Sequence, residues 1–261
     1  MVRGRAQRQR RGHPFMDIVI YSPVWFFGYD SIAEIISMVI LFIIGFYARK
    51  IYLLTQEKKY KHLSLTFMLL GIAFFAKSLT TWIIYREWVE HELYIGKIIE
   101  LYTLYNFGYL LHVLLSLAAY MLLLLLFWDI KDRRVVSLFL VFIVIAALFA
   151  SKAYISFHII SFILLCYLTW EFWKNAHRMR KAQQPVKRSA RQSRTSAKEQ
   201  QAKTHLQTPY MVFGAFLIIT LSQLVFLFMT GTPVLYVAGE VVQLIGYLLL
   251  LATLLIMIFR K

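Results

Sequence analysis

The chain has 261 residues, of which 60% are hydrophobic, 16% aromatic and 16% charged, and its net charge is +16. A soluble domain averages about 45–50% apolar and about 25% charged residues, and it cannot hide this excess because it still exposes about a quarter to a third of its unfolded surface. The composition therefore excludes a soluble enzyme, a secreted disulfide-rich domain and a disordered protein, and it indicates a polytopic membrane protein.

The first 30 residues precede the first long apolar run. Residues 1–15 carry five arginines, which permits two interpretations: a basic tail that later loops outweigh, or a translation start at Met16, the hypothesis that we favour. Residues 16–29 are too short and too interrupted by proline to cross a membrane. Their aromatic residues Trp25, Phe26 and Phe27 predict a segment at the membrane interface.

Seven apolar runs predict seven transmembrane helices. They cover residues 31–54, 63–85, 101–128, 135–150, 153–173, 210–229 and 234–259. These lengths favour helices, because a membrane strand needs only about 9–11 residues and alternates in polarity. We therefore expect an all-α bundle with transmembrane helices 1–5 over residues 31–173 and helices 6–7 over residues 209–261.

Basic residues in the loops predict the orientation of the bundle. The loops after helices 1, 3 and 5, together with the C-terminus, hold 20 Lys and Arg residues, whereas the opposite loops hold three. The N-terminus is therefore expected outside and the C-terminus in the cytoplasm of a multi-pass cell-membrane protein.

Residues 174–208 form the one long polar stretch after the first span. Ten Lys and Arg residues stand there against one acid, Glu199, with almost no large apolar residue, so the composition predicts a disordered cytoplasmic linker. We expect its basic residues to contact anionic lipid head groups, with a separate protein partner as the alternative. The expected contact residues are Lys174, Arg178, Arg180, Lys181, Lys187, Arg188, Arg191 and Arg194. Specific nucleic-acid binding is not expected, because no aromatic residue lies between positions 181 and 209 to stack on bases.

Polar side chains recur at helical spacing inside five of the predicted spans. Polar groups in hydrocarbon are costly and usually face the bundle interior, and a rise of 1.5 Å per residue places these in the outer half of the bundle. The pattern predicts a pocket open to the outside. Its candidate ligand-binding residues are Lys77, Asn106, His112, His158, Gln223, Glu240 and Gln243.

Lys77 and Glu240 are the two full charges well inside the spans, and we expect them to pair. The pair has two interpretations: a structural lock between helices 2 and 7, or a site that binds a ligand or a proton. The two histidines are likewise either interior residues with satisfied hydrogen bonds or ligand contacts. Glu34 belongs to the pattern Ser31-x-x-Glu34 before an apolar run, which predicts a capping box and a structural role for both residues.

The spans lack the residues that a retinal protein or an intramembrane aspartyl protease would need, and their histidines do not suit a haem protein. The last span contains no lysine for a retinal Schiff base, and all four aspartates lie outside the predicted spans, where an intramembrane aspartyl protease could not use them. His112 and His158 differ by about 7 Å in predicted depth, which disfavours haem ligation. We therefore expect no enzyme activity, no metal and no cofactor.

Residues 48–79, ARKIYLLTQEKKYKHLSLTFMLLGIAFFAKSL, resemble the first hairpin of the seven-helix input modules of prokaryotic membrane sensors. The resemblance implies ligand sensing that is passed to a separate partner. The expected function is therefore a non-enzymatic sensor or accessory protein with an outer polar pocket. The alternative is a small-solute or proton-coupled transporter that uses the Lys77–Glu240 pair.

Overall fold

The computed structural model describes residues 22–23, 25–26, 28–90, 95–128, 133–150, 154–190, 196–228 and 232–259, and this part of the chain is helical. Its seven helices are α3 (Tyr29–Thr55), α4 (Lys58–Glu90), α5 (Ile95–Trp128), α6 (Arg133–Ala150), α7 (Tyr154–Ala190), α8 (Ser196–Leu227) and α9 (Pro233–Phe259). Each overlaps one of the seven apolar runs, and the prediction of an all-α fold is confirmed for the described residues.

Six of the described helices are long and apolar enough to cross a membrane. The exception is α6, whose apolar part, Arg134–Ala150, is shorter. Its 18 residues extend about 27 Å at 1.5 Å per residue, slightly less than the roughly 30 Å of a bilayer core. The structure therefore indicates a multi-pass membrane protein with six candidate spans and one shorter apolar helix.

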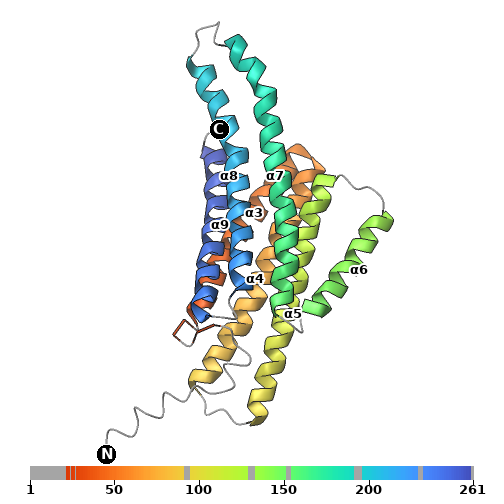
Figure 1. Cartoon of the computed structure of the whole chain (residues 1–261), viewed down its shortest axis with the longest axis vertical. Helices are drawn as coiled ribbons and strands as arrows, with labels where there is room; N and C mark the ends of the chain where they lie inside the picture. The colour runs from red at the N-terminus through yellow and green to blue at the C-terminus, as the bar shows by residue number, and fades with distance from the viewer. Residues whose placement is uncertain are drawn as a thin grey trace, which may run out of the picture.

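The six longer helices form a closed ring around the interior of the bundle. Each helix contacts the next in the order α3, α4, α5, α7, α8, α9, and α9 packs against α3 to close the ring. Figure 1 shows α6 beside this ring rather than in it, and its contacts are with α5 and α7. The two-residue turn at Gln56–Glu57 makes α3 and α4 antiparallel neighbours, and Gln56 ends α3 in the left-handed conformation with its N–H bonded to the Tyr52 carbonyl.

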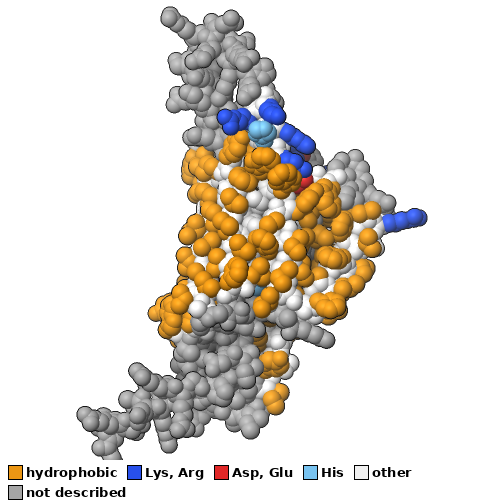
Figure 2. Space-filling view, viewed as in Figure 1, with side chains coloured by type: hydrophobic (Ala, Val, Ile, Leu, Met, Phe, Trp, Pro, Cys, Tyr) orange, Lys and Arg blue, Asp and Glu red, His pale blue; other side chains and the backbone are white. Residues whose placement is uncertain are grey.

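The outer surface of this bundle is strongly apolar, while several polar side chains are buried among the hydrophobic residues of its core. Leu138 and Phe149 on α6 are 68% and 69% exposed, whereas Glu34 and Gln223 are fully or nearly fully buried. Figure 2 shows hydrophobic side chains covering the middle of the molecule, with Lys and Arg side chains gathered towards one end of this face. Lipid is the solvent that suits such an apolar belt.

The segment 174–208, for which a disordered linker is predicted, overlaps the ends of two helices in the structure, and its disorder stays a prediction. The backbone of α7 continues to Ala190 and that of α8 begins at Ser196, so Pro209 lies inside α8. The segment is rich in Ala, Gln, Lys and Arg, which are strong helix formers. Such residues can extend a helix that the membrane segment has already nucleated, and this removes the cost that makes isolated helices unstable.

The predicted contact residues of this segment are placed only in part. Lys174 forms an ion pair with Glu171, 2.6 Å away, and Arg178, Arg180 and Lys181 are exposed on α7. The structure describes the backbone of Lys187 and Arg188 but not their side chains, and Arg191 and Arg194 lie outside the described residues.

The start of α3 corrects the predicted capping box. The helix begins at Tyr29 with Gly28 as its N-cap, and no side-chain cap bond is made there. The carboxylate of Asp30 instead accepts hydrogen bonds from the N–H groups of Gly28 and Ser31, at 2.9 and 2.8 Å. Ser31 is thus inside the first turn, and Glu34 forms an ion pair with Lys77 instead of capping the helix. The tail 1–15, Met16 and Phe27 lie outside the described residues, while Trp25 is 64% exposed and Phe26 packs against the core.

Candidate functional site

Lys77 is the centre of a charged group that joins three helices. Its ammonium nitrogen on α4 lies 2.7 Å from Oε1 of Glu34 on α3 and 3.0 Å from Oε1 of Glu240 on α9. The side chains of Lys77, Glu34 and Glu240 are 17%, 0% and 4% exposed. We call these three residues the Lys77 cluster. The expected pairing of Lys77 with Glu240 is present, and Glu34 is a second carboxylate partner that the sequence assigned to a helix cap.

Two further side chains surround the Lys77 cluster. Asp30, one turn before Glu34 on α3, is buried and close enough to interact electrostatically with Lys77 and Glu240. The Tyr236 ring on α9 has its centroid 6.0 Å from the Lys77 nitrogen, which is the outer limit of a cation–π contact. The ammonium is therefore enclosed by groups that all favour a positive charge.

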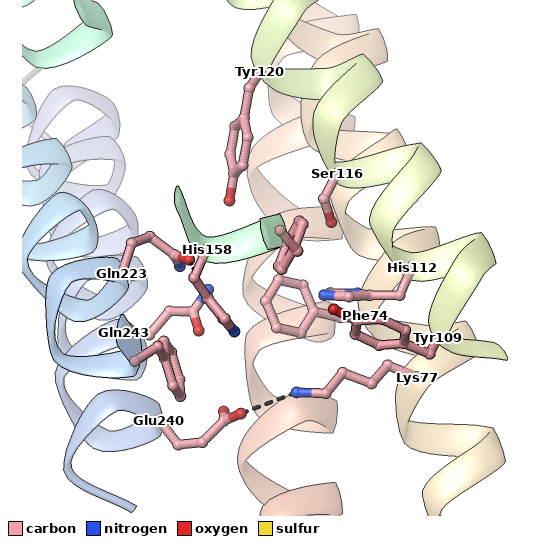
Figure 3. A pocket seen from close by; sticks show the side chains of 12 residues that line it. Phe74, Lys77, Tyr109, His112, Ser116, Tyr120, His158, Gln223, Glu240 and Gln243 are labelled. Atoms are coloured by element: carbon pink, nitrogen blue, oxygen red, sulfur yellow. Dashed lines mark hydrogen bonds and ion pairs between the residues drawn. The ribbon is translucent and has the colours of Figure 1, made fainter. Parts of the chain in front are cut away.

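A polar cavity lies beside the Lys77 cluster, inside the ring of helices (Figure 3). Six of the seven predicted candidate residues line it, and they come from five helices. The residues that line this polar cavity are Phe74, Lys77, Tyr109, His112, Ser116, Tyr120, Phe157, His158, Gln223, Phe226, Glu240 and Gln243. Figure 3 shows Lys77 and Glu240 reaching towards each other from opposite sides. Asn106 is half-buried and does not line the cavity, because it lies nearly one turn beyond Tyr109, the first lining residue of α5.

Each of the two histidines, His112 and His158, is held by a hydrogen bond from its own Nδ1 atom. Nδ1 of His112 lies 3.1 Å from the Ala73 carbonyl oxygen, and Nδ1 of His158 lies 2.7 Å from Oε1 of Gln223. Because both partners are oxygen acceptors, Nδ1 carries the proton in each ring. Both rings also contact Phe157, with centroid separations of 5.6 and 5.0 Å. The histidines border one cavity, although the residue count predicted a depth difference of about 7 Å.

The polar cavity is small in this conformation. Its volume is 10 Å³, which is about the space that one water molecule needs. A drug-sized ligand needs a pocket of about 300–1,000 Å³. The closed cavity thus has room for a water molecule or a proton, and a larger ligand requires the helices to separate.

The arrangement can hold and redistribute charge. One ammonium faces two carboxylates, so a change in the charge of either carboxylate alters how Lys77 divides its contacts between α3 and α9. Among the described residues, no group of three or more His, Cys, Asp and Glu residues is arranged to hold a metal ion.

Sequence reasoning missed several contributors to the site. Asp30 was counted as outside the spans, and the aromatic lining residues Phe74, Phe157 and Phe226 carry no polar signal in an apolar helix. Glu34 had a usable signal: two acids inside the spans, Glu34 and Glu240, stand against the single cation Lys77. That imbalance predicts a shared ammonium as readily as a simple pair.

Comparison of the chain with family models, with curated proteins and with solved structures gave no match. The functional argument therefore rests on the geometry of the site.

Proposed function

We propose that the protein is a non-enzymatic membrane sensor or accessory protein whose responsive site is the polar cavity with the Lys77 cluster. The observation that carries the proposal is the convergence of polar side chains from five helices around one cavity. The Lys77 ammonium at this cavity also contacts Glu34 on α3, the remaining helix of the ring. An occupant that changes the pairing of Lys77 changes the contacts of α3, α4 and α9 together. The resemblance of residues 48–79 to a sensor hairpin supports the same function.

The proposal includes a topology of seven spans, with α6 as the fourth, an outside N-terminus and a cytoplasmic C-terminus in the cell membrane. The chain has a single cysteine, Cys166, so a Cys166→Ser background allows single cysteines to be labelled with a membrane-impermeant maleimide. In intact cells we expect labelling of Lys152→Cys and Thr232→Cys and protection of Gln56→Cys and Lys131→Cys. Labelling of positions 131 and 152 from the same side would overturn the assignment of α6 as a span.

The exposed basic residues of α7, Arg178, Arg180 and Lys181, are proposed to contact anionic head groups at the cytoplasmic face. Each Lys or Arg near an anionic leaflet contributes about 1 kcal/mol. A separate protein partner remains the proposed route by which a sensor without enzymatic activity passes on its signal.

A transporter is the second candidate, and the sharing of Lys77 between two carboxylates favours it, because a proton-coupled carrier needs a charge that can change partners. Proton flux into proteoliposomes with an internal pH-sensitive dye separates the two functions. A sensor gives the same flux as protein-free vesicles in the wild type and in Glu240→Gln. A wild-type flux that is lost in Glu240→Gln would replace the sensor proposal with the transporter.

A further inference from the structure

Charge is unbalanced in the Lys77 cluster. Two carboxylates, Glu34 and Glu240, lie within 3.0 Å of one ammonium, and both are almost completely buried. If both acids were ionised, the cluster would hold a net negative charge in a low-dielectric interior. Such a charge is strongly disfavoured unless it is paired or neutralised.

The two carboxylates differ in their hydrogen bonds. Glu240 accepts a hydrogen bond from the Lys77 nitrogen at 3.0 Å. Glu34 is 0% exposed, and its Oε1 forms an ion pair with the Lys77 nitrogen, 2.7 Å away. Within the described part of the chain, its other oxygen, Oε2, has no hydrogen-bond partner. Oε2 is thus a buried acceptor that receives no hydrogen, and Glu34 is the member of the pair that is left unsatisfied.

We propose that Glu34 is a proton-binding site. The proton comes from water, adds to the Glu34 carboxylate and converts it to a neutral carboxylic acid, while Lys77 remains an ammonium paired with the Glu240 carboxylate. Loss of this proton returns Lys77 to two competing carboxylates, so that its ion pairing is divided between Glu34 on α3 and Glu240 on α9. The inference deepens the proposed function by naming the proton as the occupant, and it rests on that function only for the view that the site is responsive.

Other titratable groups face the cluster, and of these only the histidines can supply a positive charge. Asp30 lies on α3, Tyr236 on α9, Tyr109 and His112 on α5, and His158 on α7. The carboxylate of Asp30 already accepts two backbone N–H bonds. A positive charge on either histidine is the competing way to balance the cluster, and it would leave both glutamates ionised.

Infrared difference spectroscopy of the purified full chain in detergent tests the proposal, because a protonated carboxylic acid has a carbonyl stretch that a carboxylate lacks. We expect this band in the wild type at neutral pH. It should move to the position typical of an aspartic acid in Glu34→Asp and stay in place in the matched variant Glu240→Asp. It should disappear in Glu34→Gln, and also in Glu240→Gln, because Glu34 then becomes the sole partner of Lys77 and ionises.

Absence of the band from folded wild-type protein between pH 5 and pH 8 would overturn the inference in favour of a histidine cation. A band that moves in Glu240→Asp but not in Glu34→Asp would overturn it by placing the proton on the other carboxylate. Both results are independent of the flux measurement, so the proton site and the sensor function can fail separately.

Discussion

Lys77 and Glu34 form an ion pair between α4 and α3, with the ammonium nitrogen 2.7 Å from the carboxylate oxygen. The pair ties together two helices that are already antiparallel neighbours, and the second contact of Lys77, to Glu240, ties both of them to α9. One lysine thus connects the first two helices of the ring to the last. The stability of the bundle and the state of its polar cavity should therefore depend on the same side chain.

Replacement of Lys77 by methionine should destabilise the bundle strongly. Breaking a buried ion pair by removing one partner costs about 3–5 kcal/mol, and we expect the lower end because the two carboxyls can take up protons. The loss should grow as the pH rises, since both buried carboxyls then lose their protons without a counter-ion. Thermal unfolding in detergent at several pH values measures this.

The matched control is Lys59→Met on the same helix. Lys59 pairs with Glu57, but their side chains are 58% and 50% exposed, and exposed pairs contribute about 0–1 kcal/mol. Equal melting temperatures for Lys59→Met and Lys77→Met would show that Lys77 is not buried in a pair.

The hydrogen bond between His158 and Gln223 should couple α7 to α8. Gln223→Leu removes the oxygen that accepts from Nδ1 of His158, 2.7 Å away, and the loss of one partner of a buried hydrogen bond costs about 1–3 kcal/mol. A double-mutant cycle with His158→Leu should give a coupling energy of about 1 kcal/mol. Strictly additive effects of the two substitutions would contradict the contact.

Gly108 should be a packing point between α5 and α4. A Cβ atom there would approach Cβ and Cγ2 of Thr80 to 2.8 and 2.9 Å, and the Thr80 hydroxyl is bonded to the Ala76 carbonyl. Gly108→Ala should therefore cost about 1–3 kcal/mol through overpacking. Gly214→Ala on α8 is the control, because its Cβ would lie 3.9 Å from the nearest atom, on Leu249. Loss of stability in the control but not in Gly108→Ala would contradict the packing.

The exposed basic residues of α7 give a prediction about lipid. Removal of the charges of Arg178, Arg180 and Lys181 by substitution with glutamine should reduce the rise in melting temperature that anionic lipid produces over neutral lipid. The three charges together contribute at most about 3 kcal/mol, and salt should screen this contribution. Substitution at Lys174, which pairs with Glu171, is the internal comparison. A lipid effect that is unchanged in the triple variant would contradict the contact.

Much of the fold could be predicted from the apolar runs, because hydrocarbon requires helices of a certain length and little else. The residues at which the helices begin and end could not be predicted in this way. Hydropathy reports where a helix leaves the apolar region, not where its backbone hydrogen bonding stops, so α7 and α8 extend well into residues 174–208. The order of packing around the ring also depends on side-chain fit that periodicity does not encode.

The site was predictable where a polar residue had no other reason to be inside a span, as with Lys77, His158 and Gln223. It was not predictable where a local pattern offered a competing explanation. Ser31-x-x-Glu34 matches a capping box, yet Asp30 satisfies the helix start and leaves Glu34 for Lys77. A partner on another helix overrode a local motif, and sequence spacing alone does not reveal such a partner.

The most direct measurement compares the unfolding of Lys77→Met with that of the triple variant Lys77→Met/Glu34→Gln/Glu240→Gln. If the three residues form one charged group, the triple variant no longer buries unpaired carboxyls and should recover most of the stability lost in the single variant. A triple variant that is less stable than Lys77→Met by the sum of the two separate losses of Glu34→Gln and Glu240→Gln would contradict the Lys77 cluster.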